Sequence, residues 1–243
     1  MAQVGTHPAD VVEFVNRVNA EGDAFGYHRI DFGDGLVMDG EYDMRDYLPE
    51  YGIPSDLTGK TVLDVGTASG FFAVEFAKRG GTVTAVDIWD GDFQRMVFRA
   101  AGVDVRYEQK DLFDLDEGFG RFDLVFCGSV LLHVWDQFNA LRRLRSVCAG
   151  QAIVATAVRG RGRLWPWPRS SSGGLSQFVG TRVESDAGEY WVTWIPDPHA
   201  LVWMMKKAGF EPVEYQGNFH LRSAPGHHDY DTLHGVVHGF TSG

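Results

Sequence analysis

The sequence of 243 residues contains only two cysteines, Cys127 and Cys148. They are too far apart to form a local metal-binding or redox motif, and both lie in apolar surroundings. Isolated cysteines of this kind are typical of buried free thiols. The cysteine content therefore indicates packing residues rather than a chemical site.

Long apolar runs are also missing. The longest, LVFCGSVLL at 124–132, is far shorter than the ~20 residues that a membrane-spanning helix needs. The first residues, MAQVGTHPADVVEF, have neither a basic start nor an apolar core, and so do not resemble a signal peptide. We expect no membrane segment and a cytoplasmic location.

Positive charge is in deficit, with 22 Lys and Arg against 33 Asp and Glu and a net charge of −11. Such a charge opposes non-specific binding to nucleic acid, which depends on neutralising phosphates. Nucleic acid is thus disfavoured as a partner. One segment, 158–169, would suit it, because this segment holds four arginines and no acid: Arg159, Arg161, Arg163 and Arg169.

The remaining composition, 44% hydrophobic and 23% charged, is that of an ordinary globular chain long enough for one large domain. Apolar spacing predicts a helix over 8–20, and residues 22–58 read as irregular. From Lys60 onward strands alternate with helices, which indicates a parallel sheet covered on both faces. The expected strands are 61–65, 82–87, 103–107, 121–127 and 152–158, and the expected helices lie near 70–79, 92–101 and 133–147.

The last third of the chain breaks this alternation. A long connection is expected over about 159–190, and connections of that length are commonly functional or mobile. Asp197 then suits a helix N-cap with Pro198 at the first helical position, and Gly209 ends that helix. Two strands without a helix between them, 210–216 and 233–240, predict an antiparallel pair at the sheet edge.

The turn after the first parallel strand, in TVLDVGTASGFF at 61–72, indicates a nucleotide site. A dinucleotide fingerprint would need glycine where the chain has Ala68 and the bulky Phe71. The spacing Asp-x-Gly-x-x-x-Gly, formed by Asp64, Gly66 and Gly70, instead resembles the start of class I S-adenosylmethionine-dependent methyltransferases. Backbone N–H groups of such a turn can bind the carboxylate of the cofactor, and the acid can orient its ammonium group.

Two further acids strengthen the cofactor hypothesis. Asp87 ends the second strand 21 residues after Gly66, close to the ~20-residue spacing at which a carboxylate binds ribose hydroxyls. Asp111 ends the third strand, where it could accept a hydrogen bond from the adenine amino group. Taken singly, Asp87 could be a helix N-cap and Asp111 a turn residue. The predicted cofactor-binding residues are Asp64, Gly66, Thr67, Ala68, Gly70, Asp87, Ile88, Asp111, Leu112, Gly128 and Ser129.

A wider resemblance extends over residues 25–216. It rests on YHRIDFGDGLVMDGEYD, LTGKTVLDVGTASGFFAVEFAKRGGTVTAVDI, FDLVFCGSVLLHV and WIPDPHALVWMMKKAGFEPVE, which look like the bacterial family of wobble-uridine tRNA methyl- and carboxymethyltransferases. This resemblance implies an α/β fold: a doubly wound, mostly parallel seven-stranded Rossmann-like sheet with an antiparallel C-terminal edge. We also expect an N-terminal helical and irregular lid over 1–58, because this segment is too short to bury a core of its own, and a cofactor-binding domain over 59–243.

The N-terminal segment bears on the cofactor. Family members that use carboxy-S-adenosylmethionine have a lysine there, whereas this chain offers His28 and Arg29 and no lysine. We therefore expect ordinary S-adenosylmethionine. Small-molecule methyltransferases share the same Tyr-His segment, and the acidic composition of this chain looks more like theirs.

Methyl transfer from a sulfonium needs positioning and exclusion of water, and needs a base only when the acceptor must lose a proton. His133, near the end of the fourth strand, is the candidate base, with packing or capping of the next helix as the alternative. Aromatic residues gather outside the nucleotide half and favour an aromatic or heterocyclic acceptor, although simple packing would explain them equally well. The predicted substrate-binding residues are Tyr27, His28, Trp135, Trp165, Trp191 and Trp194.

We expect no metal. The segment PGHHDYD, with His227, His228, Asp229 and Asp231, is more typical of an exposed loop than of a metal site. Three functions remain open: methylation of a small, aromatic or heterocyclic metabolite on O, N or C; modification of RNA through the basic 159–169 segment; and cofactor-dependent regulation without catalysis. The sequence does not indicate an oligomeric state.

Overall fold

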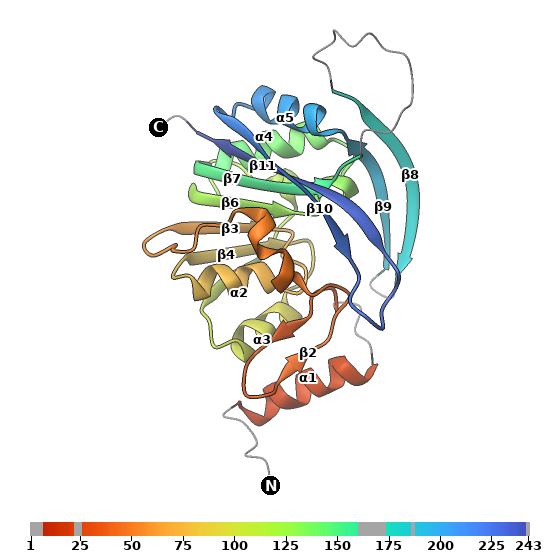
Figure 1. Ribbon diagram of the computed structural model, residues 1–243. Coiled ribbons are helices and arrows are strands. Elements are labelled where there is room, and N and C mark those ends of the chain that lie inside the picture. Colours follow the sequence, from red (N-terminus) through yellow and green to blue (C-terminus); the bar gives the residue numbers. More distant parts are fainter. Residues whose placement is uncertain (1–6, 22–25, 160–173, 186–187, 242–243) are drawn as a thin grey trace.

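A computed structural model describes residues 7–21, 26–159, 174–185 and 188–241. Figure 1 shows a central sheet with helices packed around it. The helices are α1 (Ala9–Glu21), α2 (Phe71–Lys78), α3 (Asp92–Ala100), α4 (Gln137–Val147) and α5 (Pro198–Lys207), with short 3-10 helices η1 (Met44–Tyr51), η2 (Leu112–Asp114) and η3 (Leu131–His133). The strands are β1 (Ile30–Asp31), β2 (Val37–Met38), β3 (Thr61–Val65), β4 (Thr82–Asp87), β5 (Val105–Gln109), β6 (Phe122–Gly128), β7 (Cys148–Ala157), β8 (Ser176–Ser185), β9 (Gly188–Pro196), β10 (Val213–Arg222) and β11 (Asp231–Phe240).

The central sheet has seven strands in the order β10-β11-β7-β6-β3-β4-β5. Strands β3 to β7 are parallel to one another, whereas β11 is antiparallel to β7 and β10 is antiparallel to β11. This arrangement confirms the predicted α/β class, the mostly parallel sheet and the antiparallel C-terminal edge. It also brings the carboxyl ends of β3, β4, β5, β6 and β7 to one edge, where open α/β sheets bind ligands.

Two apolar layers hold helices against the two faces of the sheet. Alternate residues of β3 point to opposite layers, because side chains of a strand alternate between its faces. Val62 packs in the layer that contains Phe72 of α2, while Leu63 packs in the layer that contains Leu141 of α4. Cys127 and Cys148 are buried free thiols in the second layer, as their surroundings predicted.

The N-terminal segment belongs to the same core as the sheet. Phe14 of α1 contacts Phe93 of α3 with ring centroids 5.2 Å apart, and Tyr51 of η1 is buried against Phe72 and Phe126. The prediction that 22–58 is irregular throughout is wrong, because this stretch contains the β1–β2 hairpin and η1. These are short elements that pack on segments far away in the chain, β2 on α1 and η1 on β10 and on Phe72 of α2, which a local sequence pattern does not reveal.

The expected connection over 159–190 is also partly wrong. Strands β8 and β9 form a long antiparallel hairpin over Ser176–Pro196, separate from the central sheet (Figure 1). The two strands pair only with each other among the described residues. The backbone ladder of these strands is therefore local to the hairpin, whereas their links to the rest of the fold are side-chain and single backbone contacts.

Smaller differences concern where elements begin. The helix expected from His133 starts at Gln137, because Asp136 is its N-cap and accepts a hydrogen bond from the Asn139 N–H group. Asp197 and Pro198 begin α5 as predicted. None of the described helices combines the length and apolar character that crossing a bilayer requires.

Candidate functional site

The turn between β3 and α2 is tight and accepts only glycine at two positions. Gly66 has φ +72°, and a Cβ there would lie 2.3 Å from the Cγ2 atom of Val130. Gly70 has φ +90°, and a Cβ there would lie 2.8 Å from the Phe98 ring. Both positions combine a left-handed backbone with a close neighbour, so the glycines predicted from the sequence are required by the turn itself.

The centre of this turn is held from both sides. Ala68 has φ +47°, and its N–H donates to Asp87 Oδ2 at 2.9 Å. Its carbonyl oxygen accepts a hydrogen bond from Gln94 Nε2 at 2.6 Å. Gln94 is a buried residue of α3 that the sequence reasoning missed, because a single glutamine in a helix carries no recognisable signal.

Asp87 lies at the end of β4 beside the turn. Its Oδ1 accepts the Ile88 N–H at 2.7 Å while Oδ2 accepts that of Ala68. Burial raises the pKa of Asp87 above its usual value, and the backbone N–H groups oppose that shift. The predicted contact with ribose hydroxyls would therefore be made by a carboxylate that also fixes the turn.

Asp64, at the end of β3, is almost completely buried. Its Oδ2 accepts a hydrogen bond from Thr67 Oγ1 at 2.6 Å. Burial, with a smaller contribution from the charge of Asp87, raises the pKa of Asp64 to about 7. A cation bound next to Asp64 would favour its ionised form and lower this pKa.

Asp111 follows β5, the third neighbouring strand. Its side chain accepts the Phe113 N–H at 2.8 Å and thereby caps η2. Asp111 is nonetheless exposed. It lies at the same sheet edge as Asp87, because the N–H of the preceding residue, Lys110, donates to the Asp87 carbonyl oxygen at 2.7 Å. Leu112 is buried and Ile88 is 55% exposed.

The end of β6 carries a second cluster. Ser129 has φ +57°, and its Oγ lies 3.0 Å from His234 Nε2 on β11. His133, at the end of η3, is half-buried, and its charge contributes to lowering the pKa of His234. The sequence analysis did not predict a role for His234, because a histidine within an apolar strand is typical of a packing residue.

Strand β9 fixes the turn η3. Thr193 is buried, and its hydroxyl lies 2.7 Å from the Val134 carbonyl oxygen, to which it donates. Gln137 Nε2 donates to the carbonyl oxygens of Leu131 and Trp194 at 2.7 and 2.9 Å. The hairpin that the sequence reading took for a loop thus positions the turn that ends in the candidate base.

The predicted substrate residues fall into two groups. Trp135 is 59% exposed and contacts Phe178, with ring centroids 5.7 Å apart, and Phe178 contacts Trp194 at 5.0 Å. These three rings form a row between η3 and the β8–β9 hairpin. Trp165, and the side chain of Trp191, lie outside the described residues.

Tyr27 and His28 form the other group, against the glycine turn. Both backbone N–H groups donate to Ser69 Oγ at 3.1 Å. His28 is 4% exposed, and burial lowers its pKa to about 3. Its ring packs on Phe71 and Phe72, which is a structural environment rather than an open substrate surface.

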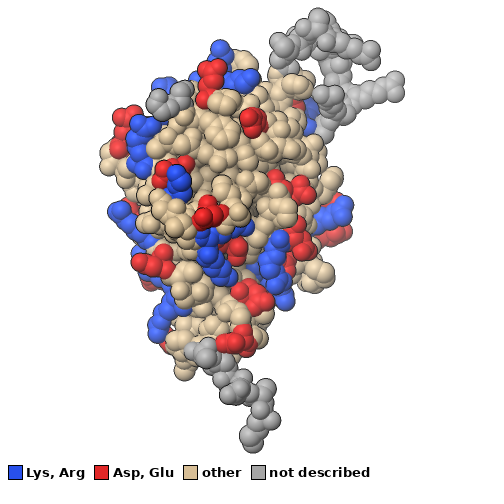
Figure 2. Space-filling view, turned by 60° about the vertical axis from the view of Figure 1, so that its left-hand side comes forward, with Lys and Arg blue, Asp and Glu red and all other residues tan. Residues whose placement is uncertain are grey.

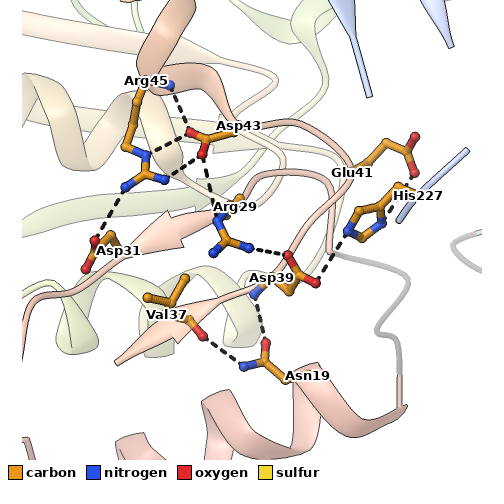
Figure 3. A network of polar contacts seen from close by, with 9 residues as sticks. All are labelled: Asn19, Arg29, Asp31, Val37, Asp39, Glu41, Asp43, Arg45 and His227. Atoms are coloured by element: carbon orange, nitrogen blue, oxygen red, sulfur yellow. Dashed lines mark hydrogen bonds and ion pairs between the residues drawn. The ribbon is translucent and has the colours of Figure 1, made fainter. Parts of the chain in front are cut away.

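Ion pairs hold the N-terminal segment in place (Figure 3). Arg29 pairs with Asp39 at 2.7 Å, and Arg45 pairs with Asp43 at 2.5 Å. His227, from the connection between β10 and β11, lies 3.5 Å from Asp39. Within the part of the chain that the structure describes, no group of three or more His, Cys, Asp or Glu residues is arranged to hold a metal ion.

Comparison with known proteins finds similarity over the central part of the chain. Residues 62–150 match the family described as a methyltransferase domain. Ubiquinone biosynthesis O-methyltransferase of Pseudomonas paraeruginosa is 34% identical over 108 residues, which cover 42% of this chain and 47% of that protein. The enzyme of the same name from Vibrio parahaemolyticus is 36% identical over 89 residues, covering 35% and 38%. The chain thus spans about half the length of the curated relatives, or less.

Solved structures share the fold over nearly the whole chain. The N-terminal domain of EvdMO1 with S-adenosylhomocysteine bound has a TM-score of 0.63 at 18% identity, covering 98% of this chain and all of that domain. A Burkholderia thailandensis 1,6-didemethyltoxoflavin-N1-methyltransferase, with its substrate and S-adenosylhomocysteine bound, has a TM-score of 0.57 at 17% identity, covering 96% and 89%. These likenesses establish the Rossmann-like methyltransferase fold.

Proposed function

We propose that this chain, whose residues 62–150 form a class I methyltransferase domain, transfers a methyl group from S-adenosylmethionine to a small aromatic or heterocyclic molecule. The observation that carries the proposal is the edge of the sheet at which β3, β4 and β5 end. Asp64, Asp87 and Asp111 stand at these three neighbouring strand ends around one glycine turn.

The residues present fit this cofactor. The cofactor supplies an activated methyl group on a sulfonium, together with an ammonium, a carboxylate and an adenosine. The buried carboxylate of Asp64 suits the ammonium, because a neighbouring cation relieves the cost of ionising a buried acid. Asp87 suits the ribose hydroxyls, since it lies at the end of β4 beside the turn. A Cβ at Gly66 would collide with Val130, so the turn stays free of side chains where the backbone must approach a ligand.

The acceptor side is formed by η3 and the β8–β9 hairpin. Trp135, Phe178 and Trp194 present flat faces in contact with one another, which favour an aromatic or heterocyclic acceptor. His133 ends η3 two residues before Trp135, and it takes the proton when the acceptor is a hydroxyl or a protonated nitrogen. The small-molecule enzymes among the relatives and structural neighbours support this class of substrate.

A tRNA substrate is the second candidate that the sequence offered. Most of the basic segment that would bind it, 160–169, lies outside the described residues. On the face in Figure 2, the described Lys and Arg side chains are interspersed with Asp and Glu rather than gathered in one patch. Together with the net charge of −11, this distribution favours a small neutral or cationic acceptor over a polyanion.

Methyl transfer tests the proposal. The protein is incubated with methyl-tritiated S-adenosylmethionine and, separately, with the small-molecule and the tRNA fractions of a bacterial extract. We expect protein-dependent label in the small-molecule fraction, and its loss in Asp87→Ala but not in the exposed control Asp104→Ala. Label in tRNA alone would favour the second candidate, and binding of the cofactor without any transfer would favour a regulator.

A further inference from the structure

The pair Ser129 and His234 has an unusual geometry for residues that would only pack. Ser129 lies in the left-handed region at φ +57° directly after β6. Non-glycine residues in this conformation carry strain, and such strain is concentrated at functional sites. The Ser129 N–H donates to the Ala155 carbonyl oxygen at 2.8 Å, and its Oγ lies 3.0 Å from His234 Nε2. The conformation therefore directs this hydroxyl at one specific histidine.

The contacts of His234 determine which of its nitrogens carries the proton. The ring is 3% exposed, and burial lowers its pKa to about 4, so that it is neutral near neutral pH. Nδ1 lies 3.1 Å from the Thr232 carbonyl oxygen. Because a carbonyl oxygen can only accept, Nδ1 carries the hydrogen and Nε2 is the unprotonated nitrogen. Phe219 stacks on the ring with centroids 5.7 Å apart, which fixes its orientation.

The hydroxyl of Ser129 consequently has a fixed polarity. It donates its single hydrogen to His234 Nε2 and keeps only lone pairs for any other partner. Ser129 Oγ is then a hydrogen-bond acceptor toward a ligand and cannot be a donor. A ligand group that suits it must bring an N–H or O–H, and an ammonium group gains most because hydrogen bonds to charged groups are the stronger ones.

The position of Ser129 identifies which ligand group can reach it. The next residue, Val130, is the neighbour on which Gly66 of the glycine turn packs. Strands β3 and β6 are paired, with Val65 opposite Cys127, so Ser129 and Asp64 belong to neighbouring strand ends. The strand end that carries Ser129 therefore lies next to the one that carries Asp64 and the glycine turn.

We propose that His234 is a positioning residue that fixes Ser129 Oγ as an acceptor for the ammonium group of the cofactor. This inference rests on the proposed function, since it assigns one more contact to S-adenosylmethionine. It adds to the site a residue 105 positions away from Ser129 in the chain, on a strand outside the matched methyltransferase domain. The antiparallel edge of the sheet thereby contributes to cofactor binding.

Two ligands separate this contact from general effects on folding. S-adenosylhomocysteine carries the ammonium group, whereas 5′-methylthioadenosine has the same adenosine and thioether without the amino-acid part. Affinities for both are measured by titration calorimetry in four proteins: wild type, Ser129→Gly, His234→Phe and His238→Phe. Ser129→Gly removes the hydroxyl at a backbone conformation that glycine accepts without strain. His234→Phe keeps an aromatic ring beside Phe219 but removes the acceptor of the serine hydrogen.

The control, His238→Phe, replaces another buried histidine of β11, which contacts the Tyr51 carbonyl oxygen and Gln151 instead of Ser129. We expect Ser129→Gly to weaken S-adenosylhomocysteine about tenfold, the usual effect of losing a hydrogen bond to a charged group. His234→Phe lowers the affinity for S-adenosylhomocysteine by a smaller factor. In that variant the Ser129 hydroxyl is still present but can rotate, so it is no longer held as an acceptor. Neither variant changes the affinity for 5′-methylthioadenosine. His238→Phe does not weaken the binding of one ligand more than that of the other.

Equal losses for both ligands in Ser129→Gly would show a merely structural role and overturn the inference. An unchanged affinity for S-adenosylhomocysteine would do the same. Melting temperatures of the four proteins identify any variant that fails to fold, and Ser129→Gly remains informative if His234→Phe does. Failure of the wild type to bind either ligand is a different result, because it would overturn the proposed function itself.

Discussion

Asp64 gives the cofactor site a pH dependence that can be measured. Burial raises the pKa of this carboxyl from its ordinary value of 3.8 to about 7. An ammonium group bound beside it stabilises the ionised form and lowers that pKa, so binding releases a proton wherever Asp64 was protonated. The affinity for a ligand that carries the ammonium group therefore rises as the pH increases through about 7.

The magnitude follows from the fraction of ionised Asp64. With a pKa of about 7, roughly a tenth of the carboxyls are ionised at pH ~6 and roughly nine-tenths at pH ~8. An ammonium group that binds only the ionised form has its apparent affinity reduced by that fraction. The dissociation constant of S-adenosylhomocysteine should thus fall about tenfold between these two pH values.

Calorimetry in two buffers of different protonation enthalpy tests this expectation, because it measures the protons released as well as the affinity. We expect close to one proton released per ligand at the lower pH and almost none at the higher. Asp64→Asn should remove the pH dependence, and 5′-methylthioadenosine should show none with the wild type. A wild-type dissociation constant for S-adenosylhomocysteine that does not change with pH would refute the reasoning.

Four further predictions concern three substitutions and the N-terminal segment. Asp64→Asn should raise the melting temperature at pH ~8, where the buried carboxyl is ionised and its charge destabilises the fold. A group whose pKa is raised by folding stabilises the fold only at low pH and loses that contribution as the pH rises through its folded pKa. An equal or lower melting temperature of the variant would show that ionising Asp64 does not destabilise the fold. Asp87→Ala should weaken S-adenosylmethionine about tenfold to a hundredfold in calorimetry, because hydrogen bonds to charged groups contribute ~1.5–3 kcal/mol; an unchanged affinity with an intact fold would remove Asp87 from the site. Residues 22–45 should gain protection from hydrogen exchange when cofactor binds, whereas equal protection with and without it would argue against a moving lid. His133→Ala should lower turnover by roughly 10²–10⁴ with little change in cofactor affinity, and a pH profile that stays the same in the variant would show that His133 is not the base.

Much of the fold could be predicted because its signals are local. Strands β3, β4, β6 and β7 contain apolar runs, and the helices between the strands have regular apolar spacing. Asp197 and Pro198 marked the start of α5 because a cap and a first-turn proline act on adjacent residues. The antiparallel edge followed from the shortness of the connection between two strands.

The elements that the sequence did not predict depend on contacts between distant segments. The sequence predicted a long connection where the β8–β9 hairpin lies, yet Thr193 of β9 donates to the Val134 carbonyl oxygen at the end of η3, and the Trp194 carbonyl oxygen accepts from Gln137 of α4. The N-terminal elements are short, and their stability comes from rings such as Tyr51 packed on Phe72 and Phe126. No spacing rule detects such contacts.

The residues of the candidate site also divide into those that the sequence predicts and those that it does not. Asp64, Gly66, Gly70 and Asp87 could be predicted, because one turn and one strand spacing contain them. Gln94 and His234 could not, since each acts across the fold on a residue far away in the chain: Gln94 on the Ala68 carbonyl oxygen, His234 on Ser129. For His28 the sequence predicted a substrate contact, whereas the structure buries its ring against Phe71 and Phe72.

The central claim is that S-adenosylmethionine binds at the carboxyl edge formed by the neighbouring strands β6, β3, β4 and β5. A crystal structure of the protein with S-adenosylhomocysteine tests it most directly. The account predicts ribose hydroxyls on the Asp87 carboxylate, the amino-acid end against the turn 66–70, and the sulfur atom facing the side of η3. A ligand bound elsewhere, or bound at this edge without contact to the turn or to Asp87, would contradict it.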